Sequence, residues 1–155
     1  MDDNEVRTRV GVADLMATYQ FLADYGKLAE LSRLFLPDAV FTTNTEKFVG
    51  PTEVLEFFGR TGVAFSSTGL LPARHHLSSI YIQPRPDGSA STYACFGLVG
   101  SRGLDHWGTY RDEVVATPDG WRFARRKVKI EGYVADSPVI ALLGLQAAAS
   151  PTGTP

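Results

Sequence analysis

The sequence predicts an α+β fold in which three N-terminal helices and one strongly curved antiparallel sheet enclose a pocket. Apolar residues recur at helical spacing in the first part of the chain and alternate at strand spacing from Arg74 onward. The turn signals PDG, SRG and PDG divide the second part into strand-length stretches, as in a meander. Helices that precede such a meander pack on one face of the sheet, and a bent sheet half closed by helices leaves a cavity.

The first helix is predicted to begin near Val12, because the ten residues at the N-terminus are charged and aperiodic. A second apolar stripe lies on this helix, and it predicts that other parts of the protein cover the helix on more than one side. Asp24 lies on this second stripe. An acid on an apolar stripe has to be paired, because unpaired burial of a charge is costly. The main stripe consists of Val12, Leu15, Met16, Tyr19, Leu22 and Ala23, and the second of Ala17, Phe21 and Leu28.

Two more helices and a strand follow. A short helix from Leu28 to Phe35 is expected to end before Pro37, since a proline disfavours helix in the residue before it. The strand AVFTTN (39–44) comes next. A third helix begins near Pro51 and runs towards Gly62.

Four strands are predicted, at 74–83, 90–99, 107–116 and 121–134. The second is apolar on both faces, so the helices are expected to cover one face and a second copy of the chain the other. In the last strand the basic residues share parity with Trp121 and Phe123, which indicates a β-bulge that switches its faces. The basic run Arg125, Arg126, Lys127 and Lys129 is read as a solvated strand face, with a substrate carboxylate or coenzyme A phosphate as the alternative.

Composition places the chain among single-domain globular proteins. With 155 residues it is long enough to bury roughly two thirds of its unfolded surface. A formal charge of -2 gives no basic field for nucleic acid, and Cys95 stands alone, so no internal disulfide is expected. No signal peptide or membrane-length apolar run is recognised, which predicts a cytoplasmic protein. We expect a flexible N-terminus at 1–10, the domain at 11–136, and a C-terminal segment at 137–155 with a disordered end.

Six motifs together resemble the SnoaL-like branch of the nuclear transport factor 2 superfamily. This cone-shaped fold includes scytalone dehydratase, ketosteroid isomerase and limonene epoxide hydrolase, and the likeness covers about residues 10–134. The motifs are Tyr19-x4-Asp24, LFLPDAVF at 34–41, Gly50 before the third helix, ARHHLSSIYI at 73–82, GTYRDEVV at 108–115 and DGWRFARRKV at 119–128.

The resemblance implies a catalytic pair. In dehydratase and dehydrohalogenase members an aspartate late in the first helix bonds a histidine on the first long strand, and the histidine acts as base. Asp24 and His75 match these positions. An asparagine often follows four residues after that histidine, whereas this chain has Ser79, which puts substrate orientation through that residue in doubt.

The residue types fit proton transfer. An imidazole exchanges protons near neutral pH, and a neighbouring carboxylate fixes its tautomer and stabilises its cation. Tyrosine hydroxyls suit the stabilisation of a developing oxyanion, and Tyr19 is expected to assist the pair. The side chains expected to bind substrate are Phe41, Phe58, Ser79, Tyr93, Tyr110 and Glu131.

The other histidines are interpreted differently. Strand alternation sends His75 and His76 to opposite faces, and the resemblance favours His75 as the one in the pocket. His106 is interpreted as an exposed residue at the start of a strand and kept as a spare candidate. No metal site is expected, because adjacent strand residues point apart and no zinc-type spacing is present.

These observations predict a cofactor-independent lyase or isomerase. The resemblance implies a dehydratase-like reaction by Asp–His proton transfer on a small hydrophobic polyketide, aromatic or steroid-like substrate, in a homodimer without nucleic-acid or membrane partners. Two alternatives stay open. An epoxide-opening hydrolase or cyclase would be favoured by an inward Glu131, and a non-catalytic ligand-binding or dimerisation module by a solvated Asp24.

Overall fold

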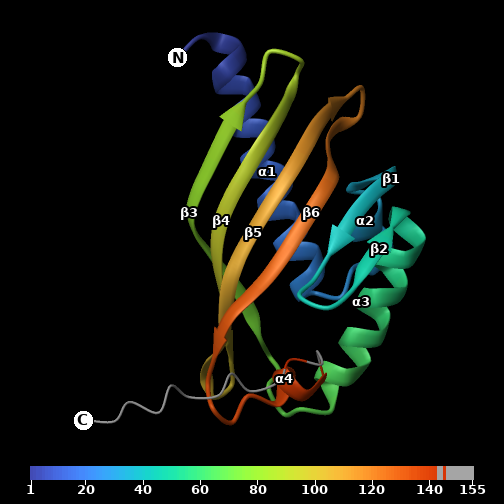
Figure 1. The fold of residues 1–155 in the computed structure, drawn as a ribbon, viewed down its shortest axis with the longest axis vertical. Helices are drawn as coiled ribbons and strands as arrows, with labels where there is room; N and C mark the ends of the chain where they lie inside the picture. The colour runs from blue at the N-terminus through green and yellow to red at the C-terminus, as the bar shows by residue number, and fades with distance from the viewer. Residues whose placement is uncertain (143–144, 146–155) are drawn as a thin grey trace.

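The structure is a computed structural model that describes residues 1–142 and 145. It has an α+β architecture, with one curved, unclosed six-stranded sheet and the helices gathered on one side of it (Figure 1). The segment SPTGTP at the end of the chain, which was predicted to be disordered, lies outside the described residues. The helices are α1 (Asp3–Asp24), α2 (Leu28–Ser32), α3 (Gly50–Ser66) and α4 (Pro138–Leu142), and the strands are β1 (Phe35–Thr42), β2 (Lys47–Val49), β3 (Arg74–Pro84), β4 (Ser89–Gly100), β5 (Gly103–Thr117) and β6 (Gly120–Tyr133).

The sheet has the strand order β2-β1-β6-β5-β4-β3. Strands β3 to β6 form the predicted antiparallel meander. The sheet is not antiparallel throughout, because β1 pairs in parallel with β6, and the short β2 was not predicted. The predicted bulge in β6 is confirmed: Glu113 lies opposite Arg125 while Val114 lies opposite Phe123, so Ala124 is the extra residue. This bulge turns Phe123 inward and Arg125 outward.

Helix α1 begins at Asp3, so the predicted start at Val12 is wrong. The Asp2 carboxylate accepts a hydrogen bond from the Glu5 amide at 2.8 Å and caps the helix, and Glu5 pairs with Arg9 one turn later. The prediction that the second apolar stripe of this helix is covered is also wrong. Phe21 is 50% exposed, because only the main stripe faces the sheet.

The second helix is shorter than predicted, and β1 begins at Phe35, inside the expected helix. Phe35 pairs with Phe123 of β6, and tertiary pairing overrides its helical spacing. Pro37 is tolerated within the strand because the β1–β6 register is interrupted between Phe35 and Val40. No helix in the described part of the chain is long and apolar enough to cross a bilayer.

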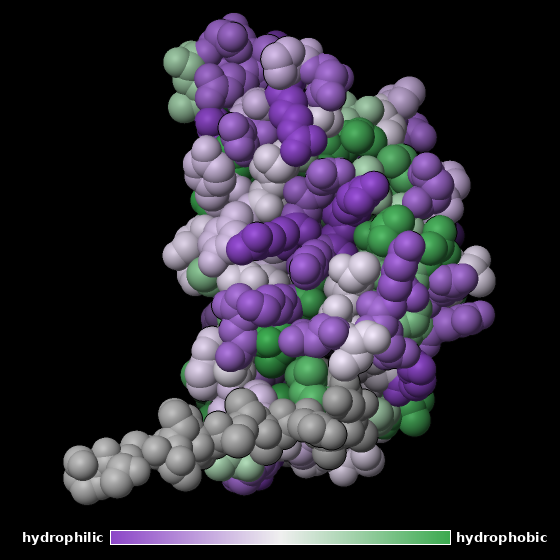
Figure 2. All heavy atoms as spheres, viewed as in Figure 1, coloured by the Kyte–Doolittle hydropathy of each residue, from purple (hydrophilic) through white to green (hydrophobic). Residues whose placement is uncertain are grey.

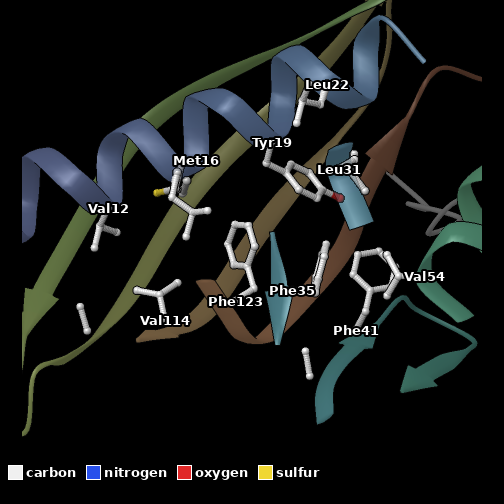
Figure 3. Packing of buried hydrophobic residues seen from close by; sticks show 14 of the residues in the cluster. Val12, Met16, Tyr19, Leu22, Leu31, Phe35, Phe41, Val54, Val114 and Phe123 are labelled. Atoms are coloured by element: carbon white, nitrogen blue, oxygen red, sulfur yellow. The ribbon is translucent and has the colours of Figure 1, made fainter. Parts of the chain in front are cut away.

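The core lies between α1 and the concave face of the sheet. Figure 3 shows Val12, Met16 and Tyr19 directed from α1 towards Val114 and Phe123. The interpretation of Arg126 as a solvated residue is wrong. The residue is 1% exposed, since the bulge at Ala124 sets its parity inward.

The outer face of the sheet is mainly hydrophilic (Figure 2). Tyr93 of β4 is half-buried there, and the Arg111 guanidinium lies 5.8 Å from its ring centroid. Long charged side chains from neighbouring strands therefore cover part of the face that was expected to need a second copy of the chain.

We predict that Gly50→Ala destabilises the fold. Gly50 has φ +78°, and a Cβ there would lie 2.8 Å from the carbonyl oxygen of Pro37. A left-handed backbone and a clash with backbone together cost about 1–3 kcal/mol in the free energy of unfolding, measured by urea titration. The control is Gly59→Ala in the same helix, where a Cβ meets no atom within 4 Å. That change should stabilise by about 0.5–1 kcal/mol, and equal effects at both sites would contradict the prediction.

Candidate active site

A cavity of about 420 Å³ opens between the helices and the concave face of the sheet. Its size is in the usual range for small-molecule sites. The walls are mainly aromatic and aliphatic, so the polar side chains that reach the cavity decide its chemistry. Its aromatic lining consists of Tyr19, Tyr25, Phe41, Phe57, Phe58, Phe65, Phe96 and Tyr110, together with the rings of His75 and His106.

Asp24 and His75 meet in this cavity. The His75 Nδ1 lies 2.7 Å from Oδ1 of Asp24, and the His75 backbone amide donates to Oδ2 at 3.0 Å. The side chains are 8% exposed for Asp24 and 24% for His75. With the carboxylate ionised, Nδ1–H is the donor and Nε2 is left as the proton acceptor. The arrangement holds one imidazole tautomer in a largely apolar space.

The end of α1 and the start of β3 bring this pair together. Helix α1 ends at Asp24 because Gly26 adopts φ +67°, and the Lys27 amide then donates back to the Leu22 carbonyl at 2.9 Å. Strand β3 starts at Arg74, so His75 is its second residue and its backbone amide reaches the helix end. His75 lines the cavity, whereas His76 is exposed.

A second histidine lines the same cavity. His106 is 3% exposed, so its interpretation as an exposed residue is wrong. Its Nδ1 lies 2.8 Å from Oδ2 of Asp105, and the Ser137 hydroxyl donates to that same oxygen at 2.8 Å. Burial lowers the pKa of His106; the hydrogen bond with Asp105 opposes this, and positive charge on His75 lowers it further.

Strand β5 explains why His106 was misplaced. The strand starts at Gly103, earlier than predicted, and Asp105 is an extra residue at a register shift opposite β4. His106 consequently faces inward with Tyr110, four residues on, with which it shares strand parity. That parity and the adjacent Asp105 were the signals available in the sequence.

A family profile described as "SnoaL-like domain" matches residues 4–127. The chain belongs to the SnoaL-like domain family. Its fold is the NTF2-like or cystatin-like fold of similar solved structures. No curated protein matches the sequence.

Three solved structures illustrate the likeness of fold. One is a candidate scytalone dehydratase from Novosphingobium aromaticivorans, with 21% identity over 86% of this chain and 91% of that one, at a TM-score of 0.74. Another is a variant of Rv3472, a protein of unknown function from Mycobacterium tuberculosis, with 17% identity, 92% and 88% coverage, and a TM-score of 0.77. A third is the hexachlorocyclohexane dehydrochlorinase LinA-type3 from Novosphingobium barchaimii, with 14% identity, 86% and 93% coverage, and a TM-score of 0.72.

Tyr19 and Tyr110 line the cavity of this SnoaL-like domain together with the two histidines. Burial raises the pKa of Tyr110 to about 12 and raises that of Tyr19 further, although the Arg126 guanidinium opposes both shifts. The guanidinium carbon lies 3.8 Å from the Tyr19 ring centroid and 4.1 Å from that of Tyr110. Both tyrosines stay protonated at ordinary pH and are neutral hydrogen-bond donors.

Of the side chains expected to bind substrate, Phe41, Phe58 and Tyr110 line the cavity. Ser79, Tyr93 and Glu131 do not, and their placement there is wrong. Ser79 is exposed at a bulge with φ +50°, which breaks the parity that it would share with His75.

Tyr93 and Glu131 lie outside the cavity for different reasons. Tyr93 lies on the outer face of β4, between the buried Thr92 and Ala94. Glu131 sits at a second β6 bulge, opposite the register shift between Trp107 and Gly108. It is exposed and pairs with Lys129 at 3.2 Å. Among residues 1–142, no three His, Cys, Asp or Glu side chains are grouped to hold a metal ion.

The lowered pKa of His106 predicts a pH effect on stability. The unfolded chain, with an ordinary histidine pKa near 6.5, binds a proton at a higher pH than the folded chain, so acid favours unfolding. His106→Asn, whose amide can replace Nδ1–H towards Asp105, should therefore lose less stability than wild type as the pH falls from 6.5 to 5.

The difference should reach up to about 1.4 kcal/mol per pH unit in urea titrations. His76→Asn makes the same substitution at an exposed site and should follow wild type. Parallel wild-type and His106→Asn curves would show that His106 does not titrate differently in the two states.

Proposed function

We propose that this SnoaL-like protein is a cofactor-independent lyase or isomerase in which His75, held by Asp24, moves a proton between carbon and oxygen. The observation that carries the proposal is the 2.7 Å contact of the two side chains within an apolar cavity. Two structures of similar fold are named as a dehydratase and a dehydrochlorinase, enzymes of elimination, which supports the same reaction class.

For a dehydration the steps balance without a cofactor. His75 Nε2 removes a proton from the carbon next to a carbonyl, and the electron pair of that C–H bond forms the double bond as the β-hydroxyl leaves. The imidazolium returns the proton to the departing oxygen, so water is released and His75 is neutral again. The Asp24 carboxylate stabilises the imidazolium in between.

The polar side chains of the cavity support this sequence of steps. Tyr110 and Tyr19 stay neutral, so either hydroxyl suits a developing oxyanion as donor. Burial lowers the pKa of His106, which favours its neutral form beside the His75 base. The apolar walls favour a small hydrophobic substrate of polyketide, aromatic or steroid-like type.

The alternatives have less support. Epoxide opening would be favoured by an inward Glu131, and this side chain is exposed. A non-catalytic binding module would be favoured by a solvated Asp24, whose side chain is 8% exposed.

The test uses 3-hydroxy-1-tetralone, a two-ring β-hydroxy ketone whose dehydration product rearranges to fluorescent 1-naphthol. Wild-type protein should release naphthol, and His75→Asn and Asp24→Asn should each lower the rate by roughly 10²–10⁴. The first change removes the general base, and the second removes the carboxylate that orients the base and stabilises its cation. His76→Asn is the matched control and should keep the wild-type rate. An unchanged rate in His75→Asn, or no rate above buffer in wild type, would count against this dehydratase.

We also propose that the chain forms a homodimer through the outer face of the sheet. The support is that Tyr81, Val99, Leu104 and Trp107 are exposed large apolar side chains on the strands of an otherwise mainly hydrophilic face. Trp107→Lys should shift the mass measured by light scattering from two chains to one, whereas Val63→Lys on α3, also exposed, should not. A wild-type mass of one chain would refute the dimer.

A further inference from the structure

Gln20 is a buried amide in the wall of the cavity. Its side chain belongs to the lining, and the residue is 7% exposed. It lies one helical turn before Asp24 on α1, and residues four apart are neighbours on one helix face. The amide therefore sits beside the Asp24–His75 pair.

The amide has no hydrogen-bond partner among the residues that the structure describes. Neither Nε2 nor Oε1 of Gln20 is bonded. The Tyr110 hydroxyl is near enough for the amide to lower its pKa, but the two groups do not meet in hydrogen-bonding geometry. An unsatisfied buried donor and acceptor are costly, and most buried polar groups in proteins are bonded.

Gln20 is not needed to hold the catalytic pair. Both Asp24 oxygens are occupied by His75, one by its backbone amide and one by its ring. The neighbouring positions on the inner face of α1 are filled by core side chains such as Met16 and Leu22. No hydrogen bond within the described residues accounts for a buried amide at position 20, so the amide is left for a group outside the chain.

We propose that Gln20 is the polar anchor of the cavity and binds the oxygen of an otherwise apolar ketone or alcohol. Nε2–H donates to a carbonyl, and Oε1 accepts from a hydroxyl. The inference rests on the proposed function for its ligand class, since the carbonyl held by Gln20 is the one beside the carbon that His75 deprotonates. Gln20 is thus a binding and positioning residue.

The test compares two ligands that differ only in one oxygen, 1-tetralone and tetralin, by titration calorimetry. Wild-type protein should bind the ketone roughly tenfold more tightly than the hydrocarbon, and Gln20→Leu should bring the ratio close to one. Gln83→Leu makes the same change at an exposed position of β3 and should keep the wild-type ratio. Equal affinities in wild type, or an unchanged ratio in Gln20→Leu, would overturn the anchor.

Thermal unfolding separates an anchor from a structural amide. Removing an unbonded buried amide should raise the Tm of Gln20→Leu in the ligand-free protein, by about 2–4 °C for each kcal/mol gained. A lower Tm for Gln20→Leu would mean that the amide supports the fold. If the ratio of the affinities for 1-tetralone and tetralin were also unchanged, the proposal would be overturned.

The binding readout does not depend on turnover. If hydroxytetralone is not dehydrated but the ratio collapses in Gln20→Leu, the anchor stands and the lyase proposal fails. If His75→Asn abolishes dehydration while Gln20→Leu keeps both ratio and turnover, the lyase stands and the anchor fails.

Discussion

The site depends on a charge pair buried beneath it. Arg126 and Asp112 are in contact at 3.2 Å, and both side chains are fully buried. The guanidinium lies between the Tyr19 and Tyr110 rings, and Thr92 donates to the Asp112 carboxylate at 2.9 Å. This links α1 to β4, β5 and β6 at the floor of the cavity. Desolvating two charges costs free energy that an apolar core would not, so the pair is better understood as fixing the two phenols than as stabilising the fold.

Above this floor, the acid and base come from segments far apart in sequence. Asp24 is the last residue of α1, which ends before the left-handed Gly26, and His75 is the second residue of β3. The contact itself requires the sheet to curve under α1, because a flat sheet would carry β3 away from the helix end. Curvature thus produces both the cavity and the pair.

Much of this could be predicted because helical and strand periods are local. The meander, the β6 bulge and the place of His75 followed from alternation and motif order. Two of the misplaced residues, Ser79 and Glu131, lie at bulges, and each bulge inverts the parity of every residue beyond it. Ser79 lies outside the cavity because of its bulge, whereas His106 was misplaced because β5 was expected to begin only at Trp107. The helix start was misjudged because α1 continues past the sheet, where Val6 and Val10 are exposed and apolar spacing carries no information.

The two histidines are unequal in a way that suits one exchangeable proton. They lie in one row of the sheet, each opposite Leu98, and both rings contact Phe96, with centroids 5.9 and 6.0 Å away. His75 is the more exposed, and its charge disfavours charge on His106, whose pKa burial already lowers. A positive charge on His75, beside Asp24, therefore favours a neutral His106. Two neighbouring carboxylate–histidine pairs in which charge on one disfavours charge on the other suit a reaction that takes and returns one proton.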